Sequence, residues 1–475
     1  MNDYLLRIEG MNMDATVLDT HDLSTIRGSS LALLEAVRKV GAALPRIALH
    51  PISTGASIGL YSFAAAADPD AAKVRDEVDT WLRTTEPYSY LVFAVDVVPL
   101  GEGEGLALAQ EAAIAANRWR QLRVSTVALP RWNTDKGHRY ACAIDHVRVA
   151  TERGPGGKRI SKSTLERRGH GRKAKQKFYQ GEVGPIAEGM EFVNDFEALT
   201  ENAPTEALER KMAVFYADGN SFSKTRQKLC KESPDLQEWD KELRAKRRDF
   251  LRKLLAHMKA NAAAWTTKSG EYQLEVLLWG GDEFLLVTPA WNGWTAAELF
   301  FTAAASWAFR GTQLHHAGGL VFCHHKAPIQ RIRRLAEDLA GLAKKEDRSR
   351  SLLAYEVLEA FDHTGGNLER YRAGRCPAGA AGVTPAALLL SGDSIDGAEE
   401  AVKAVRSAIP RGRLQRATGL WRTDPDGAKA LIEPVYDELK AQNPAELGRL
   451  EALFGTGWPL WAHLLELWDY VGRGD

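Results

Sequence analysis

One order of strands and helices occurs twice along this chain, and it constrains the fold more than any other feature. In the first hundred residues, stretches rich in β-branched and aromatic residues alternate with stretches whose apolar residues recur at helical spacing. The predicted strands cover residues 4–10, 46–52, 56–65 and 88–98, and the predicted helices cover residues 24–42 and 69–84. This order, β-α-β-β-α-β, is that of a ferredoxin-like unit.

The same order returns in the second half of the chain. Predicted strands cover residues 211–217, 272–279, 283–289 and 313–324, with helices over 236–265, 293–309 and 329–345 and a closing strand over 386–391. The two halves share the order of elements but not the residues, so the repeat is one of topology. We therefore predict an α+β fold with two ferredoxin-like domains.

The segments outside the repeat set the predicted domain boundaries. We expect a first ferredoxin-like domain over 1–100, an insertion over 101–205, a second ferredoxin-like domain over 206–392 and a C-terminal helical bundle over 393–475. Residues 152–177 of the insertion carry ten Lys or Arg and two Glu, with several glycines. This composition indicates an exposed loop or arm, which either grips an RNA backbone or is simply solvated.

Acidic residues interrupt the second domain at two predicted strand ends. Asp218 follows the first strand, and Asp282 and Glu283 follow Gly280 and Gly281 in the turn between the second and third strands. In a β-α-β-β-α-β unit the first two strands run parallel with the third between them, so these positions fall at one edge of the sheet. We therefore expect the three carboxylates to lie close together.

Carboxylates gathered in this way suit a divalent cation that is shared with phosphate groups. Mg²⁺ or Mn²⁺ binds few protein carboxylates and takes substrate phosphates as its remaining ligands. The glycine pair allows a tight hairpin and leaves room for a nucleotide near the backbone. The pattern thus predicts a metal-dependent nucleotide site at Asp218, Asp282 and Glu283, although acidic residues after a turn are often only solvated.

Composition excludes several other classes. Lys plus Arg equals Asp plus Glu at 62 each, so no global positive field points to nucleic acid. The four cysteines form no CxxC pair, and the N-terminus lacks the pattern of a signal peptide. The most apolar stretch, residues 294–311, is interrupted by Glu298 and Arg310. We therefore expect a cytoplasmic protein without a membrane span.

Residues 280–284, GGDEF, match the signature of the GGDEF nucleotide cyclases. The wider pattern, including YADGNSF around Asp218 and the late strand and helix over 313–345, resembles the large palm-polymerase subunit of type III CRISPR effector complexes. That family makes cyclic oligoadenylate from ATP in antiviral defence. The resemblance implies two palm domains, ATP as substrate, Mg²⁺ or Mn²⁺ as cofactor, and guide or target RNA and other effector subunits as partners.

The resemblance also implies roles for individual residues. Asp218 and Asp282 would be catalytic metal ligands with Glu283 as a third, Gly280 and Gly281 would lie against the nucleotide, and Lys344 would touch its triphosphate. Lys344 at a helix end is equally consistent with a solvated side chain. Guanine-specific GGDEF enzymes carry an Asn where this chain has Arg226, and the first palm has no acidic residue in its corresponding turn. The first palm is therefore expected to be non-catalytic.

Three other interpretations stay open. The chain is alternatively a catalytically inactive, RNA-binding scaffold subunit of an RNA-guided effector complex, or a stand-alone enzyme of the diguanylate cyclase type that uses GTP. Separately, His138, Cys142 and His146 are spaced four residues apart, which on a helix would place them on one face. That spacing leads to the hypothesis of a degenerate zinc finger in the insertion.

Overall fold

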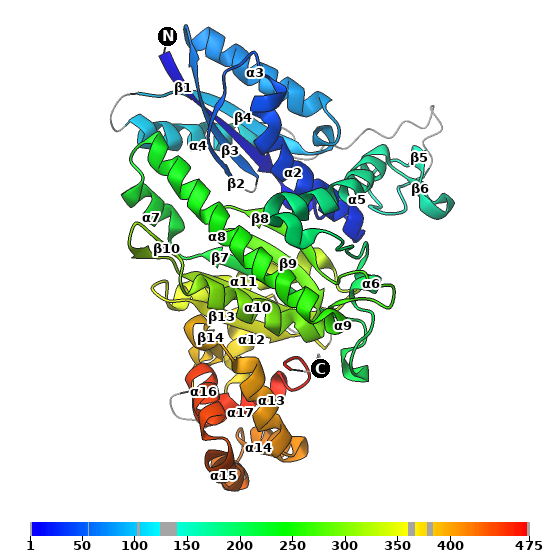
Figure 1. Ribbon diagram of the computed structural model, residues 1–475, viewed down its shortest axis with the longest axis vertical. Helices are drawn as coiled ribbons and strands as arrows, with labels where there is room; N and C mark the ends of the chain where they lie inside the picture. The colour runs from blue at the N-terminus through cyan, green and yellow to red at the C-terminus, as the bar shows by residue number, and fades with distance from the viewer. Residues whose placement is uncertain are drawn as a thin grey trace. The chain divides into compact units, whose positions relative to one another are not determined.

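The computed structural model describes residues 2–55, 57–101, 105–123, 140–359, 366–377 and 383–472, and the statements below concern these residues (Figure 1). The chain divides into two compact units, each of which is described by itself. Unit 1 comprises Met1–Gly189, Ser221–Asp249 and Val276–Phe284, and unit 2 comprises Met190–Asn220, Phe250–Glu275 and Leu285–Asp475.

The first ferredoxin-like domain lies in unit 1 and has the predicted topology. Its sheet has the strand order β2-β3-β1-β4, with β1 paired antiparallel to both β3 and β4. The strands are β1 (Asn2–Met11), β2 (His50–Gly55), β3 (Ile58–Ala65) and β4 (Val92–Pro99), and the helices are α1 (Met13–Thr16), α2 (Leu23–Ala43), α3 (Asp68–Thr84) and α4 (Gly105–Arg123). Asp22 caps α2 by accepting a hydrogen bond from the Thr25 amide at 2.9 Å.

The insertion corrects one expectation from the sequence. The first part, a hairpin of the short strands β5 (Glu152–Arg153) and β6 (Arg159–Ile160), is mostly exposed as expected, but residues 162–177 are not a loop or arm, because they belong to the long helix α5 (Lys162–Val183). Figure 1 shows α5 running beside α2. A Cβ atom on Gly28 of α2 would lie 1.7 Å from the carbonyl oxygen of Arg167, so only glycine permits this close approach.

Buried ion pairs join α5 to the first domain. Arg167 is fully buried and donates hydrogen bonds of 2.9 Å to each carboxylate oxygen of Asp19. Arg148 also donates to Asp19, and it donates to Asp145 at 3.2 Å. A charged residue can be buried when its charge is paired and its donors are satisfied, and this explains how Arg167 is buried in a basic stretch whose other Lys and Arg side chains are mostly exposed.

The second ferredoxin-like domain is built on a six-stranded sheet of order β14-β13-β12-β7-β9-β8. Its strands are β7 (Lys211–Gly219), β8 (Glu275–Gly280), β9 (Glu283–Pro289), β12 (His316–His324), β13 (Leu352–Val357) and β14 (Leu389–Ser391). The order β8-β9-β7-β12 repeats the order β2-β3-β1-β4 of the first domain, which confirms the predicted repeat. β13 runs parallel to β12 and was not predicted from the sequence, whereas β14 fulfils the prediction of a closing strand.

Helices cover this sheet and continue into the C-terminal region. In unit 2, α10 and α11 pack against β7 and β12, and α13 to α17 pack against one another as the predicted helical region. The remaining elements are α6 (Phe196–Leu199), α7 (Phe222–Leu229), α8 (Ser233–Ala260), α9 (Ala262–Trp265), α10 (Ala290–Ala304), β10 (Ala308–Phe309), β11 (Thr312–Gln313), α11 (Ile329–Glu346), α12 (Leu368–Arg375), α13 (Ala398–Ala408), α14 (Arg411–Leu420), α15 (Pro425–Gln442), α16 (Pro444–Phe454) and α17 (Trp458–Glu466). None of the helices in the described part of the chain has the length and apolar character needed to cross a membrane.

Candidate nucleotide site

The glycine-rich turn predicted from the sequence joins β8 to β9. Gly281 adopts a left-handed backbone conformation with φ of 57°, which glycine tolerates without strain. Asp282 and Glu283 are partly exposed, while the strand residues on both sides of the turn are buried. The polar interruption in this apolar sequence therefore coincides with the point where the hairpin reaches the surface of its unit.

A buried arginine of α8 holds this turn. The guanidinium of Arg247 donates a hydrogen bond to the carbonyl oxygen of Gly281 and lies 5.9 Å from the ring centroid of Trp279 on β8. Arg247 is 3% exposed, and burial lowers its pKa to about 10. Sequence reasoning placed residue 247 in a helix but gave no sign of this contact, because the contact depends on how α8 packs against the hairpin.

A pocket of about 60 Å³ opens beside the turn within unit 1. We call it the hairpin pocket, and it is lined by Ser53, Phe222, Ser223, Arg226, Trp239, Asp240, Leu243, Gly281 and Asp282. Its wall combines the aromatic rings of Phe222 and Trp239, which contact each other edge-to-face, with one guanidinium and two carboxylates. Such a lining offers both hydrogen-bond donors and acceptors around an apolar surface, as ligand pockets commonly do.

The first domain contributes to this pocket through the end of β2. Ser53 donates a hydrogen bond of 3.2 Å to Asp240. Arg244 donates hydrogen bonds to the Thr54 hydroxyl at 3.0 Å and to the Asp240 carboxylate at 2.6 Å. The sequence pattern of this turn, which lacks acidic residues, predicts a catalytically silent first palm. The structure adds that the same turn forms part of the pocket wall.

In unit 2, Asp218 lies near the end of β7 and is paired with Lys344. The Nζ atom of Lys344, in the last turn of α11, donates hydrogen bonds to the Asp218 carboxylate and, at 2.9 Å, to the carbonyl oxygen of Gly219. The side chains of Lys344 and Asp218 are 16% and 27% exposed. The sequence indicated both residues separately, but not that they contact each other.

The predicted site residues thus fall into two groups. Gly280, Gly281, Asp282 and Glu283 belong to unit 1, whereas Asp218 and Lys344 belong to unit 2. In the strand order of the six-stranded sheet, β7 is the neighbour of β9. The catalytic, metal and nucleotide-contact roles assigned to these six residues stay predictions.

The predicted metal role concerns carboxylates that belong to the two different units. Across the residues that the structure describes, no three His, Cys, Asp or Glu side chains gather where they could hold one metal ion. Mg²⁺ bound to a triphosphate needs only one or two protein carboxylates, because phosphate oxygens and water complete its octahedron. The described residues therefore show no metal centre at Asp218, Asp282 and Glu283, and metal binding by these carboxylates stays a prediction.

The spacing argument for zinc is wrong where the structure covers it. Residues 142–146 form a turn rather than a helix, and His146 is exposed with a left-handed φ of 56°. The Sγ atom of Cys142 is buried and lies 3.5 Å from the Thr164 hydroxyl. His138 lies outside the described residues. Cys142 and His146 therefore do not share a helical face.

Comparison with known proteins identifies the fold. No family model matches the sequence, and no curated protein does. Among solved structures, the Csm1-Csm4 cassette in complex with AMPPNP matches with a TM-score of 0.53 and 16% identity, covering 100% of this chain and 70% of that chain. The same cassette in complex with cA4 matches with a TM-score of 0.52 and 16% identity, covering 99% of this chain and 70% of that chain. Csm1 in T. onnurineus matches with a TM-score of 0.53 and 15% identity, covering 98% of this chain and 69% of that chain. The chain therefore has the fold of Csm1, as the resemblance implied, with two palm domains and a C-terminal helical region.

Proposed function

We propose that this chain is a palm-domain nucleotidyltransferase that makes a cyclic oligoadenylate from ATP within a type III CRISPR effector complex. The observation that carries the proposal is the GGDEF hairpin, which lies in the second palm of a fold shared with Csm1. Solved structures of that fold contain ATP, AMPPNP and cA4. Sequence, fold and the ligands of similar structures thus support the same chemistry.

In this proposal, Asp218 and Asp282 bind the divalent cations that accompany ATP, with Glu283 as a further ligand. The cations would neutralise the triphosphate and lower the pKa of the attacking 3′-hydroxyl. Gly280 and Gly281 leave space for the nucleotide near the hairpin backbone. Lys344 places a positive charge beside Asp218, and this charge would be available to a phosphate oxygen if a cation neutralised that carboxylate.

The hairpin pocket is the proposed binding place for part of the nucleotide. It borders Asp282 directly, and its apolar rings and polar groups suit a planar base with donor and acceptor atoms. Arg226 supplies hydrogen-bond donors there, and Asp240 supplies acceptor oxygens. The Asn expected of a guanine-specific enzyme is absent at position 226, which favours ATP over GTP.

The proposal includes macromolecular partners. The similar structures pair Csm1 with Csm4, and we propose that this chain likewise assembles with other effector subunits and with guide or target RNA. Residues 162–177 belong to α5, which packs on α2, so they do not form a free basic arm for RNA, although Arg172, Lys173 and Lys177 are exposed. RNA contact therefore rests on the fold rather than on a free arm.

A catalytically inactive scaffold is the second candidate. It is favoured by the pairing of Lys344 with Asp218, because an ammonium group here occupies one of the two predicted metal-binding carboxylates. In an inactive subunit that ion pair would be a permanent structural link. In an enzyme, a divalent cation would compete with Lys344 for the carboxylate.

Pyrophosphate release separates these candidates. Purified protein is incubated with each of the four nucleoside triphosphates and Mn²⁺, alone and with guide and target RNA. The enzyme proposal expects release from ATP that disappears in the Asp282→Ala variant, and GTP as the exclusive substrate would indicate the diguanylate cyclase type instead. Absence of release under every condition would leave the scaffold as the better account.

A further inference from the structure

The GGDEF hairpin is packed with the first palm. Residues Val276–Phe284, which contain the end of β8 and the turn, belong to the same compact unit as the first palm and the insertion. Most of β9 and the other strands of the second palm belong to unit 2. Four sets of contacts tie the hairpin to the rest of unit 1.

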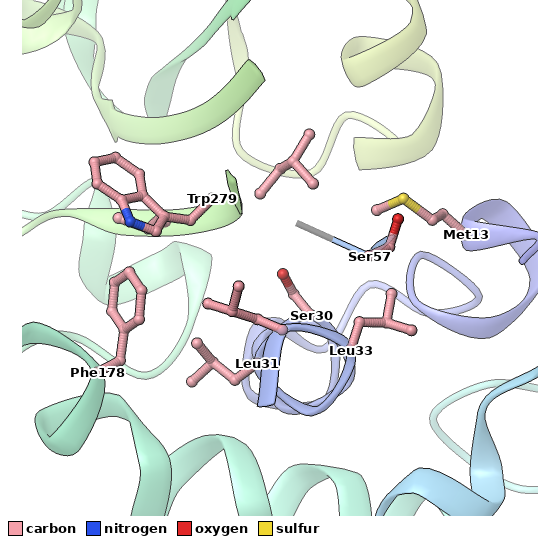
Figure 2. Close-up of a pocket in the computed structure, with 10 residues that line it drawn as sticks. Met13, Ser30, Leu31, Leu33, Ser57, Phe178 and Trp279 are labelled. Carbon is pink, nitrogen blue, oxygen red and sulfur yellow. The ribbon is translucent and has the colours of Figure 1, made fainter. Parts of the chain in front are cut away.

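The first contact is made by α2, which packs against β8. The Ser30 hydroxyl donates a hydrogen bond of 2.5 Å to the carbonyl oxygen of Leu277. Figure 2 shows Ser30 and Leu31 on α2 facing a small cavity that Trp279 and Phe178 border from the other side. The cavity measures only about 10 Å³, so the helix and the strand are closely packed.

The second contact joins the turns of the two palms. A Cβ atom built on Gly55, at the end of β2, would lie 3.0 Å from the amide nitrogen of Gly281 and 3.3 Å from its Cα atom. The two glycine backbones therefore lie directly against each other. Any side chain at position 55 would push on the turn that carries Asp282.

The third contact is a buried carboxylate of the insertion. Glu182, on α5, accepts hydrogen bonds from Arg38 of α2 at 2.8 Å and from the indole nitrogen of Trp279 at 3.1 Å. It also accepts from Arg248 of α8 at 3.1 Å. Burial opposes the ionisation of Glu182, but the charge and hydrogen bond of Arg38, the hydrogen bond of Trp279 and the charge of Arg248 together outweigh it and lower the pKa of Glu182. Glu182 thus ties the first palm, the insertion, α8 and β8 together.

Arg247 completes this set at the turn itself. Its guanidinium, packed near the ring of Trp279, donates to the Gly281 carbonyl, which belongs to the peptide group that precedes Asp282. Fixing that peptide plane fixes the backbone nitrogen and Cα atoms of Asp282, and it therefore restricts the directions in which the Asp282 side chain can leave the backbone. Arg247 is too buried to reach a substrate in solvent, so it acts on the turn and not on the ligand.

We propose that the first palm and the insertion serve as a clamp for the GGDEF hairpin, with Arg247 as the positioning residue that orients Asp282. The effect of the clamp on catalysis rests on the proposed function, because it assumes that Asp282 is a catalytic residue. The contacts that form the clamp lie within unit 1 and do not depend on that function. The clamp gives the non-catalytic first palm a task in the second palm's chemistry. It also assigns a role to three residues, Arg38, Glu182 and Arg247, that the sequence motifs did not single out.

Hydrogen–deuterium exchange of the full chain tests the clamp without reference to activity. In Arg247→Met, exchange of the amides in residues 276–284 should accelerate by at least about tenfold, while amides of β13 keep their rate. Arg247→Lys, which restores one donor, should fall between Arg247→Met and the unaltered chain. Arg83→Met, at an exposed arginine of α3, is the matched control and should leave the hairpin unchanged. Unchanged exchange at the hairpin in Arg247→Met would overturn the proposal.

A second variant approaches the clamp from the other side. Gly55→Val keeps Arg247 and its hydrogen bond but places methyl groups against the Gly281 backbone. It should also accelerate exchange at residues 276–284, whereas Gly41→Ala, whose Cβ would have its nearest neighbour at an ordinary 3.6 Å, should not. If circular dichroism shows that Arg247→Met does not fold, unchanged exchange at residues 276–284 in Gly55→Val would overturn the proposal.

Steady-state kinetics distinguish a failure of the clamp from a failure of the proposed nucleotidyltransferase activity. If the unaltered chain releases pyrophosphate from ATP, Arg247→Met should lower kcat by about tenfold or more and change KM by less than about twofold. Partial recovery of kcat is expected in Arg247→Lys, and an unchanged kcat in Arg247→Met would contradict the positioning role. If the unaltered chain releases none, the proposed function fails, and the exchange experiment still decides whether the clamp exists.

Discussion

Lys344 donates a hydrogen bond to the carboxylate of Asp218, so the residue predicted to touch phosphate is bonded to the residue predicted to bind metal. The last turn of α11 and the end of β7 are joined by this ion pair and by the bond from Lys344 to the Gly219 carbonyl. In the proposed function, a divalent cation at Asp218 would compete with the ammonium group for the carboxylate, and Lys344 would then face the anion that the cation brings. The pair would in that case link nucleotide binding to the state of Asp218.

Replacing Lys344 with methionine should weaken nucleotide binding. The variant keeps the aliphatic volume of the side chain but removes the charge available to the triphosphate, so KM for ATP should rise by about tenfold. Lys345→Met, at the neighbouring lysine that pairs with exposed Glu369, is the control and should behave as the unaltered chain. A KM that is unchanged in Lys344→Met, measured by pyrophosphate release, would remove Lys344 from the site.

Arg226 provides a test of the hairpin pocket. Arg226→Ala removes the guanidinium that lines the pocket beside Asp282, and it should raise KM for ATP by about tenfold with little effect on folding. Lys228→Ala, on the exposed side of the same helix α7, should leave KM unchanged. Equal effects of the two substitutions would show that the loss reflects general charge rather than the pocket.

The buried ion pair of α5 predicts a large effect on stability. Arg167→Met leaves the carboxylate of Asp19 without its bidentate partner in a buried environment, and the free energy of unfolding should fall by about 3 kcal/mol. Urea denaturation followed by circular dichroism measures the change. Arg83→Met, at an exposed pair, should cost less than about 1 kcal/mol. A loss in Arg167→Met as small as that of the control would contradict the structural role given to α5.

Glu298 predicts a pH dependence of stability. Burial between α10 and α13 raises the pKa of Glu298 from 4.5 to about 7, against hydrogen bonds from Trp294 and the Gly397 amide that favour ionisation. The folded chain therefore holds this proton more tightly than the unfolded chain. The resulting stabilisation is fully present below pH 4.5 and is lost as the pH rises through about 7.

Substituting glutamine removes this titration. The free energy of unfolding of the unaltered chain should include a loss of about 2 kcal/mol between pH 5 and pH 7.5 that Glu298→Gln lacks. Urea denaturation at both pH values gives the difference directly. Identical pH profiles for the two proteins would show that Glu298 ionises normally in the folded state.

The repeated topology could be predicted from the sequence, because the periods of apolar residues and the glycine-rich hairpin are local signals. The sequence was insufficient for α5, where Gly169 and Gly171 disfavour a helix by propensity and neighbouring positive charges repel one another. The helix forms because Gly171 allows close packing on α2 and because Asp19 neutralises Arg167. Both partners lie far away in the sequence, so no local pattern predicts them. The short apolar strand β13 was missed because such runs have no diagnostic period.

The candidate site shows the same limit. Asp218, Gly280, Gly281, Asp282, Glu283 and Lys344 were found because they belong to motifs. Arg247 and Ser53 carry no motif, and their relation to the hairpin appears only when α8 and β2 are packed beside it. Tertiary packing, rather than the residues themselves, places them in the site.

Electron paramagnetic resonance of Mn²⁺ tests the central claim most directly, because binding requires no RNA activator and no turnover. The claim is that carboxylates at two strand ends of the second palm bind divalent cations together with the nucleotide triphosphate. With AMPPNP present, the unaltered chain should bind Mn²⁺, and Asp218→Ala and Asp282→Ala should each weaken that binding by at least about tenfold, whereas Asp79→Ala on α3 should not. Binding of Mn²⁺ and AMPPNP that is equally tight in the two site variants and the unaltered chain would contradict the account.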